Sequence, residues 1–369
     1  MKGISSTTTA VAQRNQEESG EQKLEEERSS MMTGFVMFIV GLVMIMGTHS
    51  RVTIPRDSIK ELIQKALVES MAQKQRDLIQ GDKELMEQDP EVMPGFFQGD
   101  MAGMFDGEDD LGRVGINFKQ FPNRKWPNNT VHYLISDLYV PEEYQIIKTA
   151  IDMLGFFTCI TFKEWDGDKP DYLIIWPVQK PNGCWSYVGR LGGPQIVSLQ
   201  KPDKKSPQCF AGLGRPLHEI MHALGVYHEQ SRPDRDKFIS VTKTNVLTGF
   251  INNFDKLAST NVSLPFHYDY NSIMHYGTNF FSKNRKNPTL VPKEKGAKIG
   301  QRITLSQLDC LKLNSMYGCL DDEAFDKRKY YTICDFLGLE STHASVHKTA
   351  SEEFYCDIRL NQDYSNRRR

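Results

Sequence analysis

The sequence predicts an α+β fold for the part of the chain between Trp126 and Cys319. Short runs rich in β-branched and aromatic residues are separated by turns that contain Gly and Pro, as is typical of strands. These runs cover 131–135, 160–165, 172–178 and 196–199. The run 141–157 begins with Pro, which is favoured at the first position of a helix, and repeats its apolar residues at helical spacing. Strands and a helix therefore alternate within one unit.

Length and composition set the outer limits. The chain has 369 residues, enough for about two compact units. With 39% hydrophobic and 25% charged residues it can build a core, which excludes a wholly disordered, collagen-like or coiled-coil protein. A formal net charge of -2 gives no overall attraction to a phosphate backbone, so no nucleic-acid partner is expected.

The N-terminal residues indicate export. Residues 1–30 are polar and are expected to form a disordered leader. Met31–Gly47 carries no charge, and its apolar part is as long as the core of a signal peptide, so 31–50 is predicted to be one. The alternative is a signal anchor that keeps 31–47, which would make the chain a type II membrane protein. In both cases the seven cysteines lie in a compartment that permits disulfides.

Three segments follow the signal. Residues 56–87 have the pattern of an amphipathic helix or two, but are too few to fold alone. The acidic run 106–110 and Arg113 form a polar stretch open to proteolysis, which places a boundary at 113. After Cys319 the chain becomes charged and weakly patterned, and 320–369 is predicted to be a small extension.

The string LHEIMHALGVYHEQSRPDRD at 217–236 carries the chemistry. His218 and His222 are four residues apart, so on a helix both imidazoles lie on one face and can bind one metal ion. Gly225 can end the helix in a left-handed conformation and return the chain so that His228 reaches the same point. Three neutral imidazoles leave zinc an open position for water, whose pKa it lowers to about 7. Glu219 beside them is the candidate general base.

This string resembles the active site of the astacin family of zinc metalloendopeptidases, within the metzincins. Ser272–Gly277 (SIMHYG) is similar to the Met-turn of that family. The resemblance implies one Zn²⁺ per chain, with Met274 beneath the metal and Tyr276 stabilising the oxyanion. It also implies a twisted, mostly antiparallel five-stranded sheet and two subdomains flanking a cleft, within a catalytic domain at 114–319.

The same resemblance assigns further roles. Phe97–Asp100 (FQGD) looks like the family's inhibitory motif, in which Asp100 occupies the place of the catalytic water, so 51–113 would be an inhibitory propeptide cut by an activating protease near Arg113. Glu229 resembles the family glutamate that pairs with the amino terminus created by that cut. Trp185 and Tyr187 are similar to residues of the edge strand that binds substrate, although both suit an ordinary core equally well.

Cysteines and sequons complete the set. The resemblance implies bridges from Cys159 to Cys319 and from Cys184 to Cys209. Cys310 is expected to be a buried free thiol, and Cys334 is a candidate partner for Cys356. Acceptor sequons for N-linked glycans begin at Asn128 and Asn261.

Together these observations predict a secreted zinc endopeptidase made as a zymogen and acting on proteins or peptides. One alternative is a membrane-tethered protease, if 31–47 is retained. The other is a secreted module that binds zinc but has lost catalysis, although no ligand or base has decayed in the motif.

Overall fold

The computed structural model describes residues 89–93, 95–103, 116–204, 206–257, 266–321 and 327–338. The chain divides into the units Met1–Arg51 and Val52–Arg369, and every described residue belongs to the second. The predicted leader, signal segment, 56–87 helix and acidic run, with Arg113, Asn261 and Cys356, lie outside the described residues. Among the residues described, no helix has the length and apolar character needed to span a bilayer.

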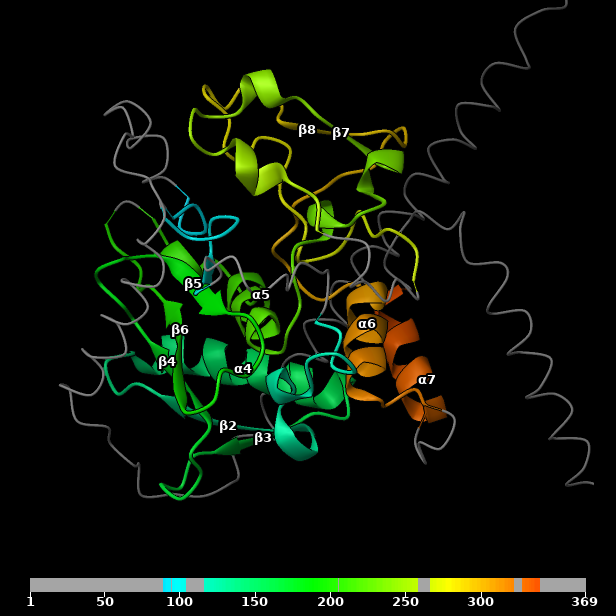
Figure 1. Cartoon of the computed structure of the whole chain (residues 1–369). Coiled ribbons are helices and arrows are strands. Elements are labelled where there is room, and N and C mark those ends of the chain that lie inside the picture. Colours follow the sequence, from blue (N-terminus) through cyan, green and yellow to red (C-terminus); the bar gives the residue numbers. More distant parts are fainter. Residues whose placement is uncertain are drawn as a thin grey trace, which may run out of the picture. The chain divides into compact units, whose positions relative to one another are not determined.

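A six-stranded mixed sheet organises the fold, in the order β1-β5-β6-β4-β2-β3 (Figure 1). Its strands are β1 (Met101–Ala102), β2 (Thr130–Ile135), β3 (Thr161–Glu164), β4 (Tyr172–Trp176), β5 (Cys184–Tyr187) and β6 (Pro194–Leu199). Four of the runs predicted from sequence thus form β2, β3, β4 and β6. Every residue of β4 except Trp176 is buried, because this strand lies in the middle of the sheet and is covered on both faces.

The expectation of a mostly antiparallel five-stranded sheet is wrong in strand direction. β1–β5, β2–β3, β2–β4 and β4–β6 are parallel pairs, and β5–β6 alone among the described pairs of this sheet is antiparallel. The reason lies in the connections. Helix α4 (Pro141–Phe157) joins β2 to β3 as a crossover, which makes them parallel, whereas a short loop joins β5 to β6. The sixth strand, β1, comes from the segment before the predicted cut.

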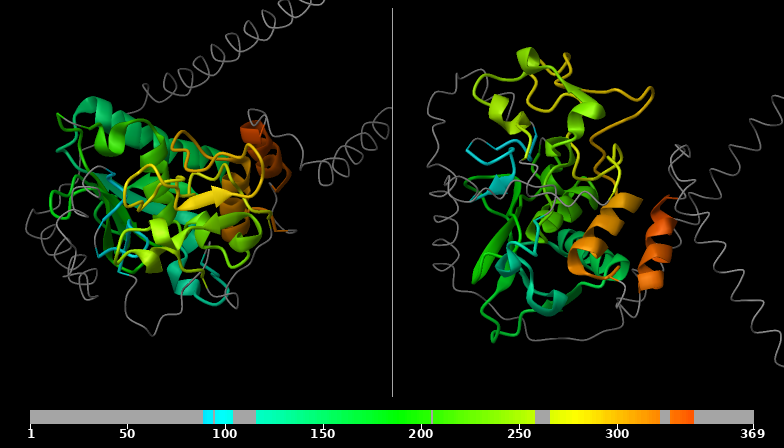
Figure 2. Two further views of the ribbon diagram at one scale, coloured as in Figure 1. Left: turned by 90° about the horizontal axis from the view of Figure 1, so that it is seen from above. Right: turned by 45° about the vertical axis from the view of Figure 1, so that its right-hand side comes forward.

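Helices cover one face of this sheet. α4 occupies the predicted residues, and it lies beside α5 (Gly214–Ala223) against the strands (Figures 1 and 2). Alternate residues of β4 point to opposite faces: Leu173 and Ile175 join the cluster beneath the helices, and Tyr172 and Ile174 join a second cluster on the other face. The sheet thereby supports α5, which packs against β5 and β6.

The C-terminal half adds a smaller layer and two more helices. β7 (Ile239–Val241) pairs antiparallel with β8 (Leu290–Pro292), around a third hydrophobic cluster that includes Tyr276. α6 (Gln307–Tyr317) and α7 (Lys327–Gly338) lie side by side (Figure 1). Short 3₁₀ helices occupy Pro122–Arg124, Pro127–Asn129, Gln208–Phe210, Glu229–Ser231, Arg235–Lys237, Lys243–Asn245 and Ile251–Phe254. The division into two subdomains flanking a cleft stays a prediction.

Three disulfides fasten these elements. Cys159–Cys319 and Cys184–Cys209 are the pairs implied by the resemblance. The third bridge joins Cys310 of α6 to Cys334 of α7, so the expectations of a free Cys310 thiol and of a Cys334–Cys356 pair are wrong. The Cys310–Cys334 pair could not be predicted because α7, which brings Cys334 next to α6, has no strong helical pattern in its sequence.

Candidate metal and catalytic site

The candidate site is built on α5 and the turn that follows it. Pro216 lies in the first turn of α5, where its missing N–H removes no helical hydrogen bond. His218 and His222 stand one turn apart, and both are fully buried. Gly225 has a φ of +99°, and its N–H donates to His222 O at 2.7 Å, which ends the helix. The chain then returns and brings His228 to the same point.

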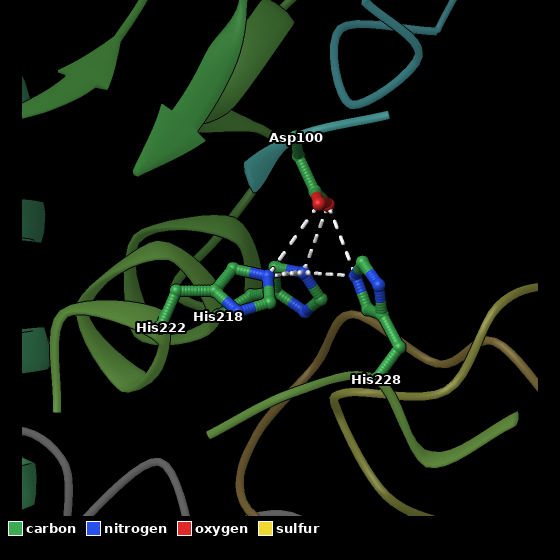
Figure 3. Close-up of side chains that lie close together, drawn as sticks. All are labelled: Asp100, His218, His222 and His228. Atoms are coloured by element: carbon green, nitrogen blue, oxygen red, sulfur yellow. Dashed lines mark hydrogen bonds and ion pairs between the residues drawn. The ribbon is translucent and has the colours of Figure 1, made fainter. Parts of the chain in front are cut away.

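Three imidazoles and one carboxylate converge there (Figure 3). The Nε2 atom of His218 lies 3.1 Å from that of His222 and 3.3 Å from that of His228. Asp100 approaches all three: its Oδ2 lies 3.2 Å from the Nε2 atoms of His218 and His228, and its Oδ1 lies 3.5 Å from that of His222. All four groups are fully buried.

The protonation of these rings tests whether a metal fits. The Nδ1 atoms of His218 and His222 face the carbonyl oxygens of Ile273 at 2.9 Å and Val226 at 2.7 Å. A carbonyl only accepts, so each Nδ1 carries the proton and each Nε2 presents a lone pair. His228 follows the same pattern, with its Nδ1 3.0 Å from Gln98 Oε1. All three lone pairs therefore point toward one centre.

Electrostatics supports the same conclusion. Burial lowers the pKa of His218, and it lowers that of His228 to about 3, so both rings are neutral. Burial alone would raise the pKa of Asp100, whereas positive charge on His228 and His222 would hold that pKa well below its usual value, so an anionic Asp100 requires a cation beside it. Lone pairs and a carboxylate facing one centre repel one another unless a cation lies between them. Ligands about 2.0–2.1 Å from a tetrahedral zinc lie about 3.3 Å apart, in accord with the observed spacings.

Glu219 follows His218 on α5 and is fully buried, and neither of its carboxylate oxygens has a hydrogen-bond partner within the described part of the chain. Burial, together with the negative charges of Asp100 and Glu91, raises its pKa well above the usual value. A buried carboxyl group without a hydrogen bond is costly, and such groups are typical of functional sites.

The Met-turn lies directly against this cluster. Ile273 O accepts the hydrogen bond from His218, and Met274 is buried in the main core with its carbonyl accepting from Glu229 N–H at 3.1 Å. The Tyr276 ring lies 4.7 Å from the His228 ring, and its hydroxyl donates to Gln98 O. Burial raises the pKa of Tyr276 well above its usual value, so the phenol keeps its proton.

Residues 89–93 and 95–103, which are called residues 89–103 from here on, run across the site and place Asp100. β1 extends the sheet by pairing with β5, and Ser186 N–H donates to Asp100 O at 2.9 Å. Gly99 has a φ of +91°, and a Cβ there would lie 2.7 Å from Glu91 O and 2.9 Å from the Phe281 ring. The FQGD motif therefore requires glycine at this position for both conformation and space.

Two contacts of this segment had no signal in the sequence. Gln98 accepts from His228 through its side chain and from Tyr276 through its carbonyl, and it does so with a φ of +48°. Glu91 is buried and receives bidentate hydrogen bonds from Arg302 at 2.7–3.0 Å, with Arg215 Nε 3.0 Å away. Both pairs join residues far apart in the chain, which periodicity and spacing do not reveal.

The remaining predicted residues divide into two groups. Trp185 and Tyr187 are buried in the cluster on the outer face of the sheet, where the Trp185 ring lies 5.2 Å from that of Phe96. β1 pairs with their strand at the edge of the sheet, so the structure brings Trp185 and Tyr187 next to residues 89–103. Asn128 is exposed, in a 3₁₀ turn.

Comparisons with known proteins identify relatives of this chain. The family profile described as Astacin (Peptidase family M12A) matches residues 118–318, more than half of the chain. Zinc metalloproteinase nas-14 of Caenorhabditis elegans is 40% identical over 208 residues, which cover 55% of this chain and 39% of the relative. Astacin-like metalloendopeptidase of Mus musculus is 41% identical over 204 residues, 53% of this chain and 44% of the relative.

The chain thus spans less than half the length of these two relatives. Among solved structures, High choriolytic enzyme 1 (HCE-1), a hatching enzyme zinc-protease from Oryzias latipes, is 32% identical, with a TM-score of 0.47 and coverage of 53% of this chain and 93% of that one. The residues that the Astacin family profile matches, 118–318, include the whole HExxHxxGxxH segment and the Met-turn. The chain belongs to the astacin family, peptidase family M12A.

Proposed function

We propose that this chain is a zinc endopeptidase that hydrolyses peptide bonds in proteins and is made in a latent form. One observation carries the proposal: three buried imidazoles present their Nε2 lone pairs toward one centre, where Asp100 supplies a fourth donor. Three nitrogen ligands are typical of catalytic zinc, because they leave a position open once the carboxylate departs.

Each residue has a defined task in this proposal. His218, His222 and His228 hold the metal. When bound, zinc supplies a Lewis acid that makes water nucleophilic near neutral pH and polarises the substrate carbonyl. Glu219 accepts the proton from water and delivers it to the nitrogen of the leaving amine, a transfer that suits a carboxyl group whose pKa burial has raised. Tyr276 keeps its phenolic proton and donates it in a hydrogen bond to the oxyanion.

Latency follows from the position of Asp100. A carboxylate is a good zinc ligand, so Asp100 would hold the place that water needs. In this proposal a protease cuts near Arg113 and residues 51–113 leave. The catalytic domain at 114–319 stays continuous with the extension 320–369, and the Cys310–Cys334 bridge joins α7 to α6.

The chain's disulfides favour export. Three bridges in the described residues suit an oxidising compartment, where the predicted signal peptide at 31–50 would deliver the chain. Sequencing the amino terminus of the protein before the cut near Arg113 tests this. A start after 50 supports release, and retention of 31–47 supports the type II membrane alternative.

The direct test of function is proteolysis by the processed form. Incubation with a denatured protein should give fragments, a zinc chelator should stop the reaction, and added zinc should restore it. An inactive zinc-binding module would retain zinc and produce no fragments under any of these conditions.

Replacing Tyr276 by Phe should lower kcat by about 10²-fold, the usual effect of losing one oxyanion donor, and should leave KM within threefold. Steady-state kinetics on a fluorogenic peptide measures both constants. Tyr270→Phe is the matched control, because its hydroxyl donates to Phe238 O, away from the histidines. Equal kcat values for Tyr276→Phe and wild type would remove Tyr276 from the mechanism.

Replacing Glu91 by Gln should raise the residual activity of the uncut chain at least tenfold. The change removes the buried carboxylate that binds Arg302 and Arg215, a loss of roughly 2–5 kcal/mol for such pairs, and so weakens the hold of residues 89–103. Peptide hydrolysis by the uncut chain is the measurement, with exposed Glu294→Gln as control. Unchanged latency would show that Asp100 and the other contacts of residues 89–103 hold the segment without the Glu91 carboxylate.

A further inference from the structure

Glu229, the residue after the third histidine, is already fully engaged in the uncut chain. Its Oε1 accepts from Asp269 N–H at 2.9 Å and from Arg232 Nη1 at 3.1 Å, and its Oε2 accepts from Lys312 Nζ at 2.7 Å. The Glu229 side chain is only 1% exposed. The resemblance assigns this carboxylate to an amino terminus made by activation, yet an ammonium group is bound to it before any cut.

Lys312 comes from α6, one turn beyond the residue that supports the Met-turn. Asp309 caps α6, and its carboxylate also accepts from Ser272 Oγ at 2.6 Å and from Ile273 N–H at 2.8 Å. Ile273 O in turn receives the hydrogen bond from His218. α6 therefore holds the first histidine through Asp309 and the third through Lys312 and Glu229.

Each cation beside Glu229 already has a carboxylate partner: Arg232 binds Asp234, and Lys312 binds Glu229. Arg232 binds Asp234 through Nε and Nη2, both at 2.9 Å, and shares only Nη1 with Glu229. Lys312 forms its ion pair with Glu229 alone among the described residues, although its charge also lowers the pKa of the nearby buried Asp269. A terminal ammonium entering here would have to displace Lys312, which would leave a buried charge without its partner, or add a further cation to a filled site.

The chain after the predicted cut is also in place beforehand. Ile116 is buried, and its N–H donates to Gly225 O at 2.9 Å, at the turn between the second and third histidines. Cutting near Arg113 would therefore leave this contact as it is.

We propose that Lys312 is a positioning residue that supplies the buried ammonium for Glu229, so the histidine site is assembled before the cut and needs no new amino terminus. This rests on the proposed function, because it describes how that site is activated. Activation then consists of the departure of Asp100 and not of the insertion of a terminus.

The test uses the full chain cut after Arg113, in four variants with wild type. An insertion of Gly-Ser between Arg113 and Val114 extends the new terminus by two residues. Lys312→Met removes the ammonium, Lys312→Arg keeps a cation, and exposed Lys298→Met is the control. For each, kcat and KM are measured on a peptide, and the rate of zinc release to a colorimetric chelator is measured without substrate.

The insertion should leave kcat within twofold of wild type. Lys312→Met should lower kcat at least 30-fold with KM within threefold, and release zinc at least tenfold faster. Lys312→Arg should recover kcat to within fivefold, and Lys298→Met should match wild type. If Lys312→Met does not fold, the insertion still decides whether a new amino terminus is needed, and Lys312→Gln replaces Lys312→Met in the measurements of kcat and zinc release.

A loss of more than tenfold in kcat for the insertion, or zinc release from Lys312→Met at the wild-type rate, would overturn the inference. Its failure is distinct from that of the proposed function. If no preparation cleaves peptide but zinc release follows the expected order, the proposed function fails and the positioning role of Lys312 stands.

Discussion

Replacing Glu219 by Gln should lower kcat/KM of the processed form by roughly 10³-fold while zinc stays bound, within the range usual for loss of a general base. Gln keeps the size of the side chain but cannot accept the proton from water. Glu219 does not belong to the cluster of donors, so the metal should remain. Peptide hydrolysis and metal analysis on the same sample measure both quantities.

Exposed Glu294→Gln serves as the matched control for this variant. Near-wild-type turnover of Glu219→Gln would contradict the mechanism. Simultaneous loss of zinc and activity would instead show that Glu219 supports the metal and is not the base.

Replacing Asp100 by Ala should make the uncut chain active, with a rate at least 10²-fold above that of the uncut wild type. Asp100 is the one carboxylate among the candidate metal ligands described. Alanine offers no ligand, so water could take that position. The measurement is peptide hydrolysis with cutting near Arg113 excluded by gel analysis.

Exposed Asp168→Ala is the control for this variant. An uncut Asp100→Ala chain that stays as silent as wild type, yet becomes active on cutting, would show that other contacts of residues 89–103 suffice for latency. The bidentate Glu91–Arg302 pair is the first of these to examine.

The local parts of the site could be predicted from the sequence. Helical spacing places His218 and His222 on one face, and Gly225 provides the turn that returns His228. The eleven consecutive residues 218–228 therefore suffice to predict that the three imidazoles converge. The run 141–157 could be predicted for a similar reason, because Pro and a period of apolar residues are local signals.

Strand direction and long-range pairs could not be predicted. Periodicity shows which residues of β4 are buried, but the path of the crossover helix decides that β2 and β3 are parallel. The contacts of Glu91 with Arg302, Gln98 with His228 and Lys312 with Glu229 join residues more than 80 positions apart. Such pairs arise from tertiary packing, so no local sequence pattern predicts them.

The central claim is that three imidazoles of the processed chain hold a zinc ion with a position left for water. X-ray absorption at the zinc edge, on the processed form with its metal content determined, tests this most directly. The account predicts one zinc per chain with three imidazole nitrogens at about 2.0–2.1 Å and one further light ligand that is lost or exchanged when an inhibitor binds. Absence of zinc, or a shell containing sulfur or a fourth permanent protein ligand, would contradict it.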